Sequence, residues 1–239
     1  MLSWRDLFGS YARLVYYSAR VALHRKLPFM AAGVACYYAA LYALAVFRPS
    51  DGFAPAQALY VLVDIPGAVL AVYLCMDQVA GERERNTLET LYSTAMSHYG
   101  VWSARLAAVY GALALCLCAM SALAYLLFAE FPFVAGGLNA WIPAFFVCNL
   151  TFFFAVFSRS SNTAGMLSLG VVVAVLLSAA SLKGGMYFLF LNPFEPPLGS
   201  DVSLWNETVF FNRGGIVVLG LLLLFGGLRR MRRREKLLG

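Results

Sequence analysis

Charged residues are scarce in this chain of 239 residues, and their scarcity excludes most soluble folds. Asp, Glu, Lys and Arg make up 13% of the sequence, whereas hydrophobic residues make up 62%. A typical soluble domain has about 25% charged and about 45–50% apolar residues. A soluble core of this size cannot bury so much apolar surface, so we expect lipid to solvate much of the chain.

The residues of common catalytic and metal sites are also few. The sequence has two histidines, His24 and His98, and five cysteines without metal-site spacing. All five cysteines lie in apolar runs, which predicts small packing residues and no disulfide framework. No glycine is followed by lysine, so a P-loop is missing and ATP hydrolysis by that route is excluded. The sequence therefore argues against an enzyme and predicts no metal or cofactor on this chain, although a carboxylate-based site stays open.

What the sequence does contain is a series of long apolar runs. A bilayer core about 30 Å thick needs roughly 20 helical residues. Six runs have this length, which predicts an all-α integral membrane protein with one domain over residues 1–239. The predicted spans are 28–47, 57–80, 106–128, 138–157, 164–182 and 209–228. Asn212 and Arg213 interrupt the last run, so its apolar part is expected to begin near Gly214.

The basic residues predict the orientation, because Lys and Arg are enriched in cytoplasmic segments. With the N-terminus inside, five, three, one and six of the 18 Lys and Arg residues fall in the four inner segments, 1–27, 81–105, 158–163 and 229–239. The outer side keeps the other three. This bias predicts a multi-pass protein of the cell (inner) membrane with both termini in the cytoplasm. It also predicts contact with lipid headgroups and not with nucleic acid.

The N-terminal segment 1–27 is predicted to form an amphipathic helix over residues 4–23. Trp4 lies on its apolar side, and the polar side carries Arg5, Arg13 and Arg20. Such a helix can lie in the membrane interface with its aromatic residues at headgroup depth. An ordinary amphipathic helix that packs on protein is the alternative.

The segment 81–105 joins the second and third predicted spans on the cytoplasmic side. It opens with charges of alternating sign, at Glu82, Arg83, Glu84 and Arg85. Asn86 can cap a helix that begins at Thr87, and Glu89 can return a hydrogen bond as in a capping box. The apolar face of this short helix would consist of Leu88, Leu91 and Tyr92. These features favour docking to a soluble partner, and a folded loop without a partner is the alternative.

Residues 81–91, which read Gly-Glu-Arg-Glu-Arg-Asn-Thr-Leu-Glu-Thr-Leu, resemble the signature of ABC-2-type transporter permeases. In that family an acidic-basic stretch leads into Gly-Thr-Leu-Glu, then leucines, a Thr-Pro-like end and a later Gly-Lys pair. Direct matches are Thr87, Leu88, Glu89 and Leu91, and Arg105 falls where the last basic residue is expected. Asn86 replaces the usual glycine and Ala95 the usual proline.

The resemblance implies the permease subunit of an ATP-driven exporter. Residues 81–100 would then form a coupling helix that seats in a groove of a separate ABC ATP-binding subunit, which would hold ATP and Mg. The resemblance also implies a dimeric pore with a second permease copy or a homologous permease, and an interfacial helix over 4–23. Alternatives are a non-transporting membrane scaffold or assembly factor, or a haem-exporter-like subunit of cytochrome maturation.

Asp64, Pro66 and Gly67 stand out within the second predicted span as candidates for a substrate pathway or for helix packing. An acid inside a span is costly unless it faces other helices or water. The simpler interpretation is a shallow Asp64 that reaches the interface. The alternatives are contact with a polar substrate or pairing with one of the outer cations, Arg48, Lys183 or Arg213. Pro66 and Gly67 could bend the helix. The long outer connection 183–208 is expected to form either partly inserted outer helices, as in the family, or a structured outer loop.

Overall fold

The computed structural model describes residues 4–24, 26–47, 59–84, 98–128, 130–158, 160–182, 185–194, 196 and 201–231. All regular structure in these ranges is helical, as predicted. In chain order the elements are α1 (Trp4–Leu23), α2 (Leu27–Phe47), the π-helical turn η2 (Tyr60–Asp64), α4 (Ile65–Cys75), α5 (Ala80–Glu84), α7 (His98–Leu127), α8 (Phe133–Phe157), α9 (Ser161–Leu177), α10 (Ala179–Leu182) and α11 (Val202–Met231).

Five helices in the described part of the chain are long and apolar enough to cross a membrane, which indicates a multi-pass membrane protein. They are Leu27–Phe47, Tyr60–Arg83, Gly100–Leu127, Phe133–Phe157 and Val202–Met231, and each overlaps a predicted span. The predicted span 164–182 is broken in the structure. There α9 ends at Leu177, the Ser178 hydroxyl donates to the Val175 carbonyl, and α10 adds one turn. A sixth crossing therefore stays a prediction.

Asn212 and Arg213 do not interrupt the helix of the last predicted span, 209–228. Helix α11 runs unbroken from Val202 through Asn212 and Arg213 to Met231. The two polar side chains do not end the helix, because both bond to oxygen atoms of other segments.

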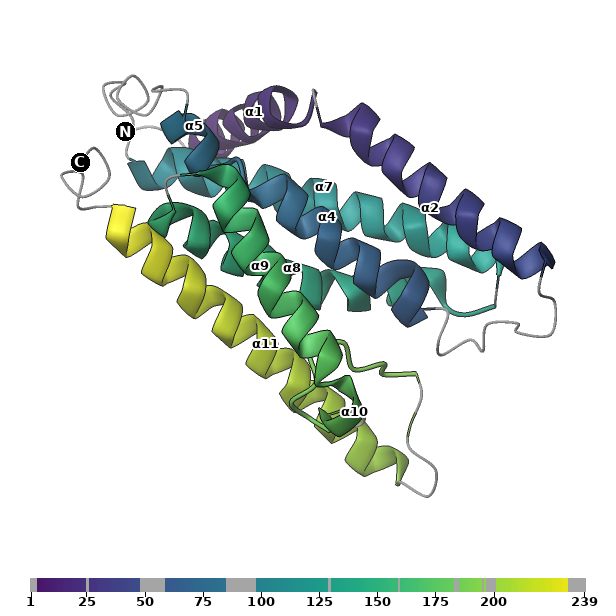
Figure 1. The fold of residues 1–239 in the computed structure, drawn as a ribbon. Coiled ribbons are helices and arrows are strands. Elements are labelled where there is room, and N and C mark those ends of the chain that lie inside the picture. Colours follow the sequence, from purple (N-terminus) through teal and green to yellow (C-terminus); the bar gives the residue numbers. More distant parts are fainter. Residues whose placement is uncertain are drawn as a thin grey trace.

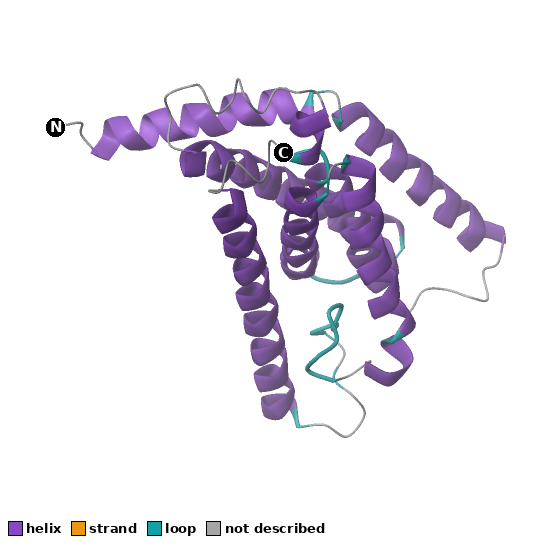
Figure 2. Cartoon of the chain, turned by 60° about the vertical axis from the view of Figure 1, so that its left-hand side comes forward, coloured by secondary structure: helices purple, strands orange, loops and turns teal. Residues whose placement is uncertain are grey.

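The arrangement has two distinct ends. Helices α1 and α5, the start of α7 and the last turns of α11 lie together at one end, here called the terminal end (Figure 1). The opposite, distal end holds α10 and the start of α11. Helix α8 is central and packs against α4, α7, α9 and α11. Helix α1 runs across the terminal end, packed on α7, and α2 stands apart from the bundle (Figure 2).

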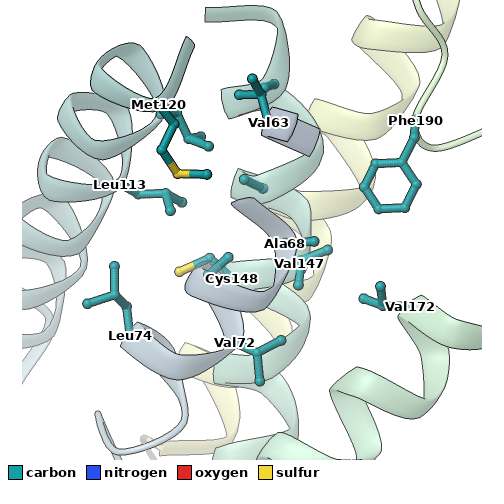
Figure 3. Close-up of a cluster of buried hydrophobic side chains, with 14 of the residues drawn as sticks. Val63, Ala68, Val72, Leu74, Leu113, Met120, Val147, Cys148, Val172 and Phe190 are labelled. Atoms are coloured by element: carbon teal, nitrogen blue, oxygen red, sulfur yellow. The ribbon is translucent and has the colours of Figure 1, made fainter. Parts of the chain in front are cut away.

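The core lies where α4, α7 and α8 meet. Figure 3 shows Val72, Leu113 and Val147 there, one from each helix, and all three are buried. A Cβ added to Gly67 of α4 would lie 2.5 Å from Leu117 Cδ2 of α7. Gly67, which the sequence offered as a bending or packing residue, is therefore a residue of close helix packing.

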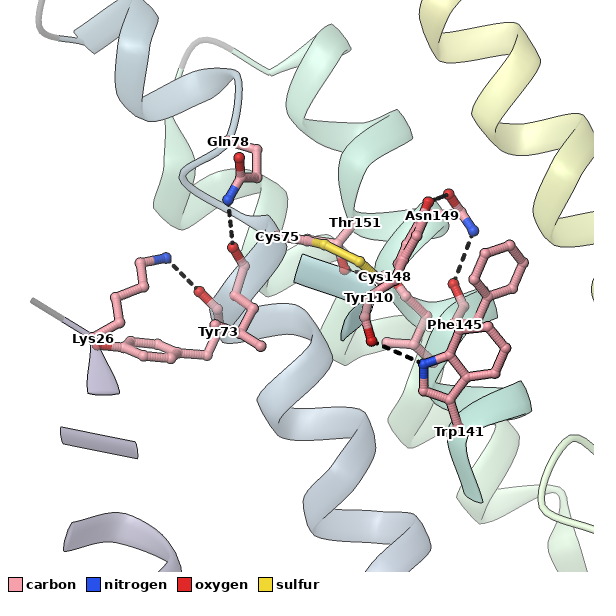
Figure 4. Close-up of a disulfide and its surroundings, with 12 residues drawn as sticks. Lys26, Tyr73, Cys75, Gln78, Tyr110, Trp141, Phe145, Cys148, Asn149 and Thr151 are labelled. Carbon is pink, nitrogen blue, oxygen red and sulfur yellow. Dashed lines mark hydrogen bonds between the residues drawn. A yellow bond between two sulfur atoms is a disulfide. The ribbon is translucent and has the colours of Figure 1, made fainter. Parts of the chain in front are cut away.

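A disulfide joins Cys75 of α4 to Cys148 of α8 within this core (Figure 4). The prediction that all cysteines are only packing residues is wrong for this pair. The prediction failed because composition does not tell which spans face each other. The free cysteines are Cys36, Cys116 and Cys118.

Two tyrosines of α2 bond to the start of the second span. Pro66 has no N–H, so the carbonyl of Leu62 loses its α-helical donor and that of Val61 its π-helical donor. The Tyr38 hydroxyl lies 2.9 Å from the Leu62 oxygen, and the Tyr37 hydroxyl lies 2.7 Å from the Val61 oxygen. Pro66 therefore creates the two acceptors that attach α2 near the distal end.

Candidate functional site

The two ends of the motif-bearing segment 81–105 lie together at the terminal end of the bundle. Arg105 of α7 forms an ion pair with Glu82 of α5, with Nη1 and Oε1 2.9 Å apart. The guanidinium also lies 5.3 Å from the ring centroid of Trp102, which is buried. Because both side chains of the ion pair are mostly buried, the pair is held in a fixed geometry.

The predicted coupling residues fall into two groups. Glu82 and Arg105 are brought into contact, and Arg83 is half-buried beside them on α5. Glu84 closes α5, and its side chain is not described. The remaining predictions lie outside the described residues: Arg85, Asn86, Thr87, Leu88, Glu89, Leu91 and Tyr92.

A second ion pair, which the sequence analysis did not propose, fixes the start of α2. Lys26 Nζ lies 2.8 Å from Asp77 Oδ2 and donates to the Tyr73 carbonyl at 2.7 Å. It also lies over the Tyr73 ring, 4.8 Å from its centroid (Figure 4). A lysine at a helix entrance and an acid near the end of a span were the available signals. They could not be paired without knowing that α2 and α4 are neighbours.

Helix α1 covers the predicted amphipathic segment 4–23 and packs on protein. Arg13 and Arg20 are exposed, as predicted for its polar face. The side chains of Trp4 and Arg5 lie outside the described residues. The helix packs on α7, where the Tyr11 hydroxyl donates to Ser103 Oγ at 3.3 Å. Packing on protein is thus observed, and a place in the membrane interface stays a prediction.

At the distal end, residues 185–191 turn back into the bundle without forming a helix, and this stretch is here called the distal segment. Its residues from Phe188 to Leu191 are buried. Irregular backbone in an apolar setting needs partners for its carbonyl groups. Asn212 Nδ2 donates to the carbonyls of Met186 and Phe188, at 2.7 and 2.9 Å. The partly inserted helices expected from the family are not found in the described residues 185–194, which form a structured loop packed on the bundle, and residues 202–208 belong to α11.

Arg213 holds the other half of the distal segment. Its Nη2 donates to the Leu191 carbonyl at 2.6 Å, and its Nε donates to Asn139 Oδ1 of α8 at 2.9 Å. A longer contact of 3.4 Å joins Nη1 to the Leu189 carbonyl. The sequence placed Arg213 among the outer cations, but it did not predict that the residue binds backbone carbonyls.

Asp64 is buried within the bundle, so its side chain does not reach the surface as the simpler interpretation required. Its exposed fraction is 2%, and both carboxylate oxygens have no hydrogen-bond partner among the described residues. Arg213, one of the cations considered as its partner, forms no ion pair with Asp64 and bonds to Asn139 and Leu191 instead. The other cations considered, Arg48 and Lys183, lie outside the described residues. Pro66 follows the π-helical turn that ends at Asp64.

Unpartnered polar atoms gather around Arg213. Besides the Asp64 carboxylate, Asn139 Nδ2 and Asn212 Oδ1 are buried without a partner in the described chain. Such atoms are costly in an apolar setting unless water or a polar ligand reaches them. Within the described ranges, no group of three or more His, Cys, Asp or Glu residues could hold a metal ion. The cluster suits water or a hydrogen-bonding ligand better than a metal.

No protein-family model and no curated protein matches this chain. The likeness of residues 81–105 to ABC-2-type permeases therefore rests on the motif itself.

Proposed function

We propose that this chain is the membrane permease subunit of an ATP-driven exporter of the ABC-2 type. Separate ATP-binding subunits would hold ATP and Mg and grip the segment 81–105. A second copy or a homologous permease would complete the pore. The proposal rests on the motif together with one observation, the ion pair between Glu82 and Arg105 at the base of that segment.

This ion pair supports coupling because it joins the segment's two ends to long helices. On one side α5 continues the span Tyr60–Arg83, and on the other α7 runs unbroken for 30 residues. A helix of that length is about 45 Å long. A force on residues 85–97 would thus reach the distal end most directly through α7, whereas the second span is divided between Cys75 and Ala80 and would pass the force on through α5 and then α4.

At the distal end the same motion would act on the distal segment. Asn212 and Arg213 hold its carbonyls in the arrangement described here. Export would require a second arrangement in which these bonds are broken, and nucleotide binding would shift the population between the two. The cargo is not specified by these residues.

The rival proposal is a membrane scaffold or assembly factor that uses the same cytoplasmic dock without transport. Both proposals predict that an ATPase copurifies with the chain. Only the permease raises the ATPase turnover and moves cargo in reconstituted vesicles. A haem-exporter-like subunit is a special case of the permease and would be recognised by haem as the cargo.

The experiment breaks and rebuilds the ion pair in the purified complex. We expect Glu82→Arg or Arg105→Glu alone to lower permease-stimulated ATP hydrolysis by about fivefold or more, since coupling free energies are typically about 1–3 kcal/mol. The double swap Glu82→Arg with Arg105→Glu should recover most of it. Arg20→Glu, on the exposed face of α1, is the matched control and should leave hydrolysis unchanged. Full stimulation of ATP hydrolysis in both single variants would refute coupling through the Glu82–Arg105 ion pair.

A further inference from the structure

An apolar groove of about 500 Å³ lies between α2 and α4. Phe29, Gly33 and Val34 line it from α2, and Pro66, Val69 and Tyr73 line it from α4. The groove exists because α2 packs loosely, with only Met30 and Tyr38 buried among its described side chains. Gly33 widens it, since a Cβ there would meet nothing within 4 Å.

Water is a poor occupant for this groove. A bound water needs two to four polar partners. The lining is aliphatic and aromatic except for the hydroxyls of Tyr37 and Tyr73, and Tyr37 already donates to the Val61 carbonyl. A groove between two spanning helices borders the bilayer interior, so hydrocarbon is the natural filling.

The volume decides which hydrocarbon fits. A spanning helix of 20 residues, about 10 Å wide and 30 Å long, occupies about 2,400 Å³. The groove has about a fifth of that volume, within the range of about 300–1,000 Å³ common for small-molecule sites. A single acyl chain therefore fits inside the groove, whereas a helix from another copy of the protein could only pack over its opening.

Charged groups stand at the terminal end of the groove. Tyr73 lines it, and the Lys26 ammonium lies over the Tyr73 ring (Figure 4). The same ammonium is paired with Asp77. The Asp77 side chain keeps 32% of its surface exposed and the Lys26 side chain 14%. The ammonium has three N–H groups, and the Asp77 carboxylate and the Tyr73 carbonyl take two of them. A neighbouring cation and anion complement a zwitterionic headgroup, because the ammonium can meet a phosphate and the carboxylate can meet an amine.

We propose that this groove binds one acyl chain of a zwitterionic glycerophospholipid, with the headgroup at the Lys26–Asp77 pair. The site is distinct from the coupling segment and from the distal polar cluster. It would exist whether the protein is a permease or a scaffold.

The test uses the full chain in nanodiscs that contain phosphatidylethanolamine with a photoreactive diazirine in its acyl chain. Labelled peptides should map to residues 29–37 and 65–73. Gly33→Trp fills the groove without a backbone clash and should lower labelling of 65–73 by about tenfold. The matched controls are Gly111→Trp and Gly170→Trp, whose positions are exposed and equally open, and they should leave that labelling unchanged.

Three outcomes would overturn the proposal. Equal labelling of residues 65–73 in the wild-type chain and in Gly33→Trp means that no chain enters the groove. Labelling spread evenly over the exposed faces of all spans means general solvation by lipid. Efficient cross-linking between two copies through Gly33→Cys means that protein covers the groove.

The headgroup is tested with a diacylglycerol probe. This probe should label the wild-type chain less than the phospholipid probe does, and the two probes should label Lys26→Met equally. Equal labelling by both probes in wild type would remove the headgroup from the proposal.

Discussion

Replacing Arg213 with methionine should release the distal segment, and the size of the effect follows from its contacts. The substitution keeps an apolar stem but removes the 2.6 Å bond to the Leu191 carbonyl. A hydrogen bond from a charged donor contributes about 1.5–3 kcal/mol. The 3.4 Å contact with Leu189 is too long to add much. The open population of the segment should therefore rise roughly tenfold to 150-fold.

Cysteine accessibility measures this opening. The free cysteines Cys36, Cys116 and Cys118 are replaced by alanine, and Leu189→Cys places a reporter in the buried segment. When opening is fast and rare, the rate of labelling by a membrane-impermeant maleimide follows the open population. Arg213→Met should raise this rate by the factor given above.

The matched control for this substitution is Arg230→Met. It lies on the same helix, where the guanidinium stacks on Phe157 at 4.0 Å near the terminal end, and it should leave the rate unchanged. A rate that is identical in Arg213→Met and in the parent protein would refute the idea that this arginine holds the distal segment.

The same measurement in an Asp64→Asn background separates the two roles of Arg213. Without the guanidinium, the Asp64 carboxylate would remain buried with neither a counter-charge nor a hydrogen-bond donor. Neighbouring sites that share an interaction couple by about 0.5–3 kcal/mol. Arg213→Met should therefore raise the labelling rate less in the Asp64→Asn background. Equal factors in both backgrounds would show that the two charges do not support each other.

Two further predictions concern the packing that positions the spans. Tyr38→Phe should lower the thermal stability of the detergent-solubilised protein by about 1–3 kcal/mol, because it removes the hydroxyl that lies 2.9 Å from the carbonyl oxygens of both Leu62 and Met120. The part due to Leu62 should vanish in a Pro66→Ala background that returns an N–H donor, so the loss should shrink there. An equal loss in both backgrounds would contradict the account of the π-helical turn. Gly137→Ala should cost about 1–3 kcal/mol by overpacking, because its Cβ would lie 2.9 Å from a backbone atom of α7, whereas Gly170→Ala occupies open space and should be neutral.

The spans were largely predictable from the sequence, and the errors lie where a partner comes from elsewhere in the chain. Runs of about 20 apolar residues need no tertiary information to be recognised. The break at Ser178 is the exception, because its hydroxyl bonds to the Val175 carbonyl only three residues away, and a hydropathy pattern does not register such a bond. Asn212 and Arg213 looked like an interruption, but their acceptors lie 22 to 74 residues away, and with those acceptors the helix continues.

The residues of the candidate site also fall into two groups, those that local sequence identifies and those that depend on distant parts of the chain. Local spacing sufficed to single out Glu82 and Arg105 as ends of one segment, because a family motif is a pattern along the chain. The depth of Asp64 could not be predicted, since its burial depends on which helices surround the second span. The Lys26–Asp77 pair and the Cys75–Cys148 disulfide were missed for the same reason.

The packing of α8 and α11 limits how a force at the terminal end could reach Arg213. A Cβ at Gly220 would lie 3.0 Å from Phe145 Cε1, and one at Gly227 would lie 2.9 Å from Phe152 Cε1. Such close contact resists sliding of the two helices past each other, so they should move as one body. Because α2 has few buried side chains, it can move relative to that body once the bonds of Lys26, Tyr37 and Tyr38 to the second span are broken. A conformational change is therefore expected to open the α2–α4 side and the distal segment, and to leave the α8–α11 contact intact.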